Sequence, residues 1–201
     1  MYKTLPLLAL TILLLSCGSN NVGGVNGDAP VAPMASDPDV IEAAAFPTAV
    51  SEPWRMAVLD YVALKNAFVA SDLTTAKVKA NDLAKRLGAA DMSAMGAGHD
   101  AWMSAAVPVQ RSAEAIASAA TLDAARANFE QLTTPVITAV KALGDGGQDL
   151  FVQYCPMALR DSGEGAPLSS RGASWVATER EVRNPYFGDA MLACGKVTEE
   201  L

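Results

Sequence analysis

The chain has 201 residues, of which 51% are hydrophobic and 18% charged, and its net charge is −7. This length suggests one domain with a tail, and the negative charge argues against binding to the phosphate backbone of nucleic acids. A single histidine excludes zinc sites that need two or three histidines. Alanine is the commonest residue and has the highest helix propensity, so the composition favours a mainly α protein.

Residues 1–16 have the features of a secretory signal peptide. Lys3 precedes an apolar run that ends at Leu15 and is too short to span a bilayer. The run is followed by Ser16 and Cys17, and this ending resembles the lipobox of bacterial lipoproteins. An ordinary signal peptide beside an incidental cysteine is the alternative interpretation. We expect cleavage before Cys17, lipidation of Cys17 and anchoring to a membrane of the bacterial cell envelope.

Residues 17–50 are rich in Gly, Asn, Ala and Pro. Such a composition buries too little apolar surface to order the chain. We therefore expect a flexible tether that holds the rest of the protein away from the membrane. Because Gly18, and not an Asp, follows Cys17, we expect the outer membrane, with the protein facing the periplasm.

Residues 51–147 carry apolar side chains at helical spacing. The pattern predicts four helices, over residues 51–69, 73–87, 98–120 and 122–143. Gly88 supplies a stop signal for the second helix, Thr121 caps the fourth, and Gly144 ends it. Pro108 and Pro135 predict a kink or break in the third and fourth helices. Short connections between the four helices favour an antiparallel four-helix bundle.

The composition changes in residues 148–201. Residues 150–154 and 173–176 have the pattern of strands, separated by a loop rich in Gly, Ser and Pro over 162–172. A turn is expected at 184–188, and Asp189 is placed to cap a short helix that carries Met191 and Cys194. We predict a small hairpin or irregular subdomain that packs on one end of the bundle.

Side chains with soft donor atoms gather in three short stretches. Five of the six methionines beyond residue 50 lie in them, together with His99, Cys155 and Cys194. Thiolate, thioether and imidazole donors favour a soft monovalent ion such as Cu(I) or Ag(I). The stretches are Met92, Met95, His99, Trp102 and Met103; Cys155, Pro156 and Met157; and Met191, Leu192, Ala193 and Cys194.

In two of these stretches the predicted secondary structure places two donor side chains on the same side of the chain. Met191 and Cys194 lie one turn apart if their segment is helical, and Cys155 and Met157 share one side of an extended segment. Three alternatives remain open from the residues alone: a Cys155–Cys194 disulfide, which an oxidising compartment favours, a metal site, or two buried free thiols. Met92, Met95 and Met103 are either further ligands or core residues.

Two long motifs make the sequence similar to an uncharacterised bacterial domain family. They run over residues 154–158, Tyr-Cys-Pro-Met-Ala, and over 184–195, from Asn-Pro-Tyr-Phe-Gly to Ala-Cys-Gly. Residues 61–72, 99–103, 129–132 and 172–175 add to the resemblance, which extends over about residues 55–200. Family members occur as lipoproteins and at the C-terminus of copper/silver efflux adaptor (membrane-fusion) proteins. The resemblance implies heavy-metal handling, with Cys155, Met157, Met191, Cys194 and His99 as ligands.

We therefore expect a lipid-anchored envelope protein that binds Cu(I) or another soft ion and buffers it or delivers it to an efflux adaptor. The alternative is a structural or interaction module, in which a disulfide closes a helical bundle that docks on an envelope partner. An enzyme is not expected, because one histidine supports no set of nucleophile, base and orienting residue, and no nucleic-acid partner is expected.

Overall fold

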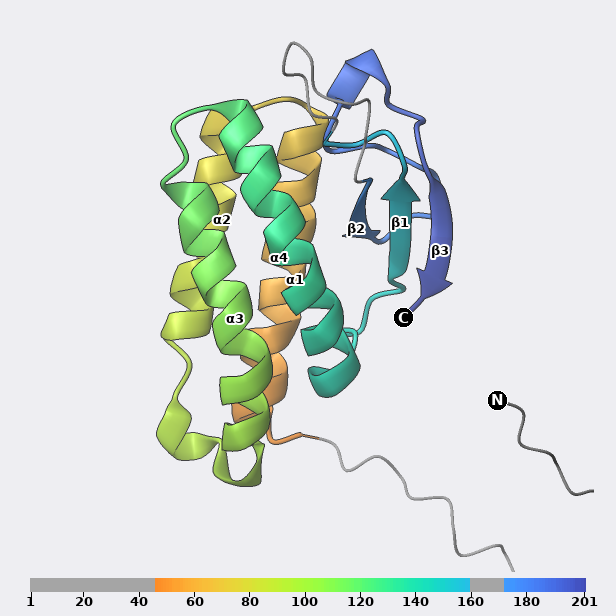
Figure 1. Cartoon of the computed structure of the whole chain (residues 1–201). Helices are drawn as coiled ribbons and strands as arrows, with labels where there is room; N and C mark the ends of the chain where they lie inside the picture. The colour runs from red at the N-terminus through yellow and green to blue at the C-terminus, as the bar shows by residue number, and fades with distance from the viewer. Residues whose placement is uncertain (1–45, 160–171) are drawn as a thin grey trace, which may run out of the picture. The chain divides into compact units, whose positions relative to one another are not determined.

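A computed structural model describes residues 46–159 and 172–201. The predicted signal peptide, Cys17, most of the tether and most of the 162–172 loop lie outside these residues. The described part is mainly helical and ends in a small antiparallel sheet (Figure 1). In the described part of the chain, no helix combines the length and the apolar character needed to cross a membrane.

Four helices form the larger part of the fold, and consecutive helices pack against each other (Figure 1). Their cores are built from alanines and from large side chains, among which Trp54, Trp102 and Phe129 are almost completely buried. Trp102 is thus a core residue. The helices are α1 (Thr48–Val69), α2 (Leu73–Gly88), α3 (His99–Ala117) and α4 (Leu122–Leu143), with two short 3-10 turns, η1 (Met92–Ala94) and η2 (Gly96–Gly98), before α3.

The ends of α2 and α4 follow the sequence signals. Helix α2 ends at Gly88, and the Thr121 hydroxyl caps α4 by accepting a hydrogen bond of 3.2 Å from the Ala124 N–H. Gly144 follows α4 with a φ of 96°, a conformation that favours glycine. These predictions are confirmed because local capping chemistry decides them.

The predicted start of the first helix is wrong. Helix α1 begins at Thr48, so residues 48–50 belong to the helix and not to the tether, because Val50 is buried against Gly98. Pro108 and Pro135 lie inside α3 and α4, which continue past them, so neither helix breaks and a kink at either proline stays a prediction. Pro108 lies on the exposed face of α3, where water can satisfy the carbonyl group that loses its partner.

Three strands follow the helices: β1 (Phe151–Cys155), β2 (Ala173–Ala177) and β3 (Lys196–Glu200), in the order β2-β1-β3. Both pairings are antiparallel, with Cys155 opposite Ala173 and Phe151 opposite Glu200. The sequence predicted β1 and β2 but missed β3, because its charged, exposed residues lack the apolar alternation of a half-buried strand. The predicted hairpin is therefore a three-stranded sheet.

The sheet packs on the helices through β2, which contacts α4 and α1. Tyr61 of α1 is buried there, and its hydroxyl oxygen accepts a hydrogen bond of 3.0 Å from the Val176 N–H in β2. Burial raises the pKa of Tyr61 to about 12. Strand β3 forms the edge of the sheet away from β2 (Figure 1).

Candidate functional site

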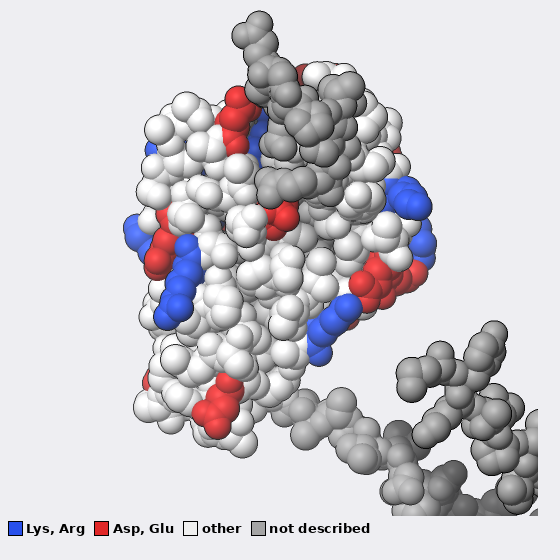
Figure 2. Space-filling model, viewed as in Figure 1, with Lys and Arg blue, Asp and Glu red and all other residues white. Residues whose placement is uncertain are grey.

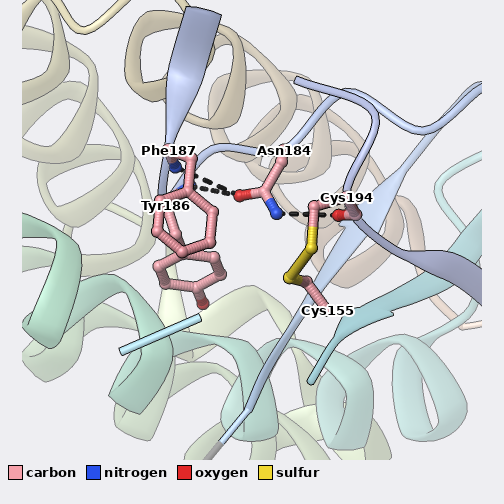
Figure 3. Close-up of a disulfide and its surroundings, with 5 residues drawn as sticks. All are labelled: Cys155, Asn184, Tyr186, Phe187 and Cys194. Carbon is pink, nitrogen blue, oxygen red and sulfur yellow. Dashed lines mark hydrogen bonds between the residues drawn. A yellow bond between two sulfur atoms is a disulfide. The ribbon is translucent and has the colours of Figure 1, made fainter. Parts of the chain in front are cut away.

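The two cysteines of the folded part form a disulfide, and their Cα atoms are 5.7 Å apart. Cys155 is the last residue of β1 and is completely buried. Cys194 lies half-buried in the turn that precedes β3. The bond therefore joins the end of the central strand to the start of an edge strand (Figure 3).

Asn184 organises the segment that carries Cys194. Its side-chain oxygen accepts hydrogen bonds from the Tyr186 N–H at 2.8 Å and the Phe187 N–H at 3.2 Å, as expected for an Asx turn. Its side-chain nitrogen donates a hydrogen bond of 2.8 Å to the carbonyl oxygen of Cys194 (Figure 3). The backbone N–H of Asn184 also donates to Leu192 O at 2.8 Å. One buried amide thus fixes both the turn at 184–187 and the cysteine ten residues later.

The aromatic residues of this segment anchor it to the helices. Tyr186 is buried, its ring lies 5.8 Å from that of Phe129 in α4, and its hydroxyl donates to Ser174 O at 2.8 Å. Trp175 in β2 is completely buried and donates a hydrogen bond of 2.8 Å to the side chain of Gln153. These side chains seal the C-terminal segment against the helices.

Met191 does not lie on the short helix that the sequence predicted. The 3-10 turn η3 (Gly188–Ala190) ends before it, and its φ of −151° and ψ of 55° are not helical. The Cys194 N–H donates to Met191 O at 3.1 Å, so the two residues bracket a single tight turn. Asp189 also makes no side-chain cap to η3. The helix fails because the chain must turn here to reach the edge of the sheet.

Met157 does not share one side of an extended strand with Cys155. Strand β1 ends at Cys155, and the Ala158 N–H donates to Cys155 O at 3.3 Å across a turn. As a result the cysteine is buried, whereas the Met157 side chain is 36% exposed. The two sulfur atoms therefore lie in different environments, although their residues are two positions apart.

His99 lies away from the cysteines, at the other end of α1. It begins α3, and the preceding Gly98 packs against Val50 near the start of α1. The Cys194 segment instead reaches the end of α1, where Gly188 packs against Ser71 and the carbonyl oxygen of Val69. A helix of this length separates its two ends by roughly 30 Å. The structure does not bring His99 together with Cys155 and Cys194.

The remaining methionines of the first stretch have separate environments. Met95 is completely buried in the helical core, and Met92 is partly buried against that core. Met103 is exposed on α3. Within residues 46–159 and 172–201, no three His, Cys, Asp or Glu side chains are grouped so that they could hold a metal ion.

Sequence reasoning missed one charged pair that supports this region. Lys65 of α1 is completely buried, and its ammonium group donates a hydrogen bond to the carboxylate of Glu179 beyond β2. The Glu179 carbonyl oxygen in turn accepts a hydrogen bond of 2.7 Å from the Gln153 side chain. The signal was present in the sequence, because Lys65 lies between Tyr61 and Phe68 on the apolar face of α1.

Charged side chains of both signs lie in small, separated groups on the face shown in Figure 2. Most of this face, on which α3 and α4 lie in front, is uncharged. The face therefore has no dominant charge that would attract one class of charged partner.

Residues 57–148 match the model of a domain family described as "Protein of unknown function (DUF3347)". The matched region begins within α1, ends at residue 148, and contains the rest of α1 and all of α2, α3 and α4. It ends before β1, so both cysteines of the disulfide lie beyond it. No curated protein and no solved structure matches the chain. The match supports an uncharacterised domain family for the helical part.

Proposed function

We propose that this protein is a lipid-anchored protein of the bacterial cell envelope that binds Cu(I) or a similar soft ion through Cys155 and Cys194. Lipidation of Cys17 and the tether over residues 17–47 would hold it at the outer membrane, facing the periplasm. It would buffer the ion or deliver it to a heavy-metal efflux adaptor. In this proposal the four helices form an antiparallel bundle, and the protein carries out no reaction on a substrate.

The observation that carries the proposal is the contact between the two cysteines. They lie 39 positions apart in the sequence, yet the fold brings their sulfur atoms into bonding contact. The hydrogen bond from Asn184 to the Cys194 carbonyl group fixes the Cys194 backbone independently of the disulfide. Two thiol groups would therefore stay close together after reduction, as a site for one soft ion requires.

Metal binding at this site would begin with reduction of the disulfide. A dithiol reductant supplies two electrons and two protons, the sulfur–sulfur bond breaks, and the reductant becomes a disulfide. The ion then binds two thiolates, and the two thiol protons are released. The candidate thioether donors are Met191, which brackets the turn with Cys194, and exposed Met157, two residues after Cys155.

A competition titration tests this proposal. The chain is used with Cys17 replaced by Ser, so that Cys155 and Cys194 are its only thiols. Reduced protein should take Cu(I) from a competing chelator, whereas the same protein with its disulfide closed should bind far more weakly. Equal affinity after replacement of both Cys155 and Cys194 by Ser would contradict the proposal. Circular dichroism of the double variant checks that the helices still form.

The disulfide itself favours a second candidate function. It ties β1 to the Cys194 turn, as in a module whose disulfide-closed bundle docks on an envelope partner. Mass spectrometry of protein treated with a dithiol reductant, without denaturant, separates the two candidates. A bond that stays closed until the chain unfolds favours the docking module, and release of two free thiols from folded protein favours metal binding.

A further inference from the structure

We infer that His99 and Met103 form a separate two-donor site for a soft monovalent cation at the start of α3. This site is independent of the cysteines and of the function proposed above. The fold places it near the first turn of α1, whereas the disulfide lies toward the last turn. It therefore remains available when both thiols are locked in the disulfide.

Helix geometry places the two donors side by side. Residues four positions apart lie on one face of a helix, with Cβ atoms about 5–6 Å apart. Side chains in helices tilt toward the N-terminus, so the Met103 side chain leans over the turn that carries His99. Both residues belong to α3, and the His99 and Met103 side chains are 46% and 44% exposed. An ion can therefore reach both from solvent.

Asp100 orients the imidazole ring for binding. Its carboxylate oxygen Oδ1 lies 3.2 Å from Nδ1 of His99. A carboxylate within hydrogen-bond distance of one ring nitrogen can accept a proton from it and so direct the lone pair of the other nitrogen, Nε2, to a metal ion, as is found behind metal-binding histidines. The same carboxylate offsets the partial positive charge at the start of a helix, which by itself disfavours a cation.

The donor set selects the class of ion. Neutral imidazole and neutral thioether offer no negative charge and no oxygen atom, so they suit a soft monovalent ion such as Ag(I) or Cu(I) better than Mg²⁺ or Ca²⁺. Met103 also has no place in the core that would explain a methionine, since it is one of the exposed large hydrophobic side chains of the described residues. The exposed pair is thus better explained as a binding site than as packing.

Nuclear magnetic resonance of the single histidine tests the inference directly. The chain contains one histidine, so its ring nitrogen signals need no assignment by mutation. The probe is Ag(I), added to full-length protein with Cys17 replaced by Ser and the Cys155–Cys194 disulfide closed. The expected result is a shift of the Nε2 signal that saturates at one equivalent of Ag(I), with a smaller change at Nδ1.

Two variants test the contributions of Met103 and Asp100 to Ag(I) binding, and a third serves as a control. Met103→Leu keeps the helix and the exposed apolar volume but should lower the Ag(I) affinity by more than tenfold. Asp100→Asn should lower it by about tenfold, the effect of removing an outer-shell partner. Met56→Leu, at a partly buried methionine of α1 that belongs to neither site, is the matched control and should leave the Ag(I) affinity unchanged. An Nε2 signal that does not move, or that moves equally in Met103→Leu, would overturn the inference.

The readout also separates this site from the function proposed above. If reduced protein failed to bind Cu(I) through its cysteines, the proposed function would be wrong, but Ag(I) should still shift the Nε2 signal of His99. Conversely, thiolate binding at Cys155 and Cys194 would not move the His99 signals, because the fold keeps the two ends of α1 apart.

Discussion

The side-chain nitrogen of Asn184 donates a hydrogen bond of 2.8 Å to the carbonyl oxygen of Cys194. Asn184 is completely buried, and its oxygen also accepts from the backbone N–H groups of Tyr186 and Phe187. This one amide links the turn that packs against α4 to the residue that closes the disulfide. The C-terminal segment thus owes its shape to polar contacts as well as to aromatic packing.

Replacing Asn184 with Ala should destabilise the protein by about 2–4 kcal/mol. The change leaves backbone donors and an acceptor without partners in a buried position, and each such group costs about 1–3 kcal/mol. Urea denaturation followed by circular dichroism measures the loss. Asn66→Ala, at an exposed position of α1, is the matched control and should change stability by less than about 0.5 kcal/mol. Similar losses in the two variants would contradict the role assigned to Asn184.

Reduction of the disulfide should lower the free energy of unfolding by up to about 4 kcal/mol. The cysteines are 39 positions apart, and closing a loop of this length removes about that much chain entropy from the unfolded state. Parallel urea titrations with and without a dithiol reductant measure the difference. The double replacement of Cys155 and Cys194 by Ser should reproduce the reduced protein and stop responding to reductant. A reductant effect that persists in that variant would show another cause.

Replacing Glu179 with Gln should destabilise the protein at neutral pH by about 3 kcal/mol. The substitution leaves the ammonium group of Lys65 completely buried without its carboxylate, and breaking a buried pair in this way costs about 3–5 kcal/mol. We expect the lower end because Glu179 is one-third exposed. The double variant Lys65→Met with Glu179→Gln should recover most of the loss, since it removes the buried charge. Chemical denaturation of both variants checks this, and no recovery would contradict the explanation.

The same pair sets a pH dependence with a definite sign. Burial raises the pKa of Glu179, but the hydrogen bond and charge of Lys65 outweigh it and hold the pKa below its ordinary value of 4.5. A carboxyl group with a lowered pKa stabilises the fold above its unfolded pKa and loses that contribution as the pH falls through the folded pKa. Stability should therefore fall below about pH 5, and less steeply in the double variant. Equal slopes would assign the acid sensitivity to other carboxylates.

Replacing Gly188 with Ala should cost more stability than replacing Gly96 with Ala. Both glycines have a positive φ, of 55° and 50°, so both variants include a similar backbone penalty of about 1–2 kcal/mol. At Gly188 a Cβ atom would also lie 2.5 Å from Ser71 Oγ and 2.9 Å from Val69 O, whereas at Gly96 it meets open space. The additional overpacking costs about 1–3 kcal/mol. Thermal unfolding of the two variants isolates this contact, and equal losses would argue against close packing of η3 on α1.

The sequence by itself determined the elements that local chemistry controls. Apolar residues at helical spacing predicted α1 to α4, the Thr121 cap and the Gly144 stop located the ends of α4, and alternation predicted β1 and β2. These features can be predicted from the sequence because the residues that cause each of them lie within a few positions of one another. The turn at Asn184 could be predicted as well, because the Asn184 side chain bonds to a backbone group only two residues away.

Only the tertiary structure decided which distant residues meet. Strand β3 exists because β1 offers it an edge, and the helix expected at Met191 is replaced by a turn because the chain must reach that edge. The residues alone left the state of Cys155 and Cys194 open, and the fold joins them in a disulfide. It also separates His99 from them by the length of α1, which turns one expected group of soft donors into two. The sequence shows which donor residues are present. The packing of helices and strands sets the distances between them, and a group of donors can bind one ion only if those distances are short.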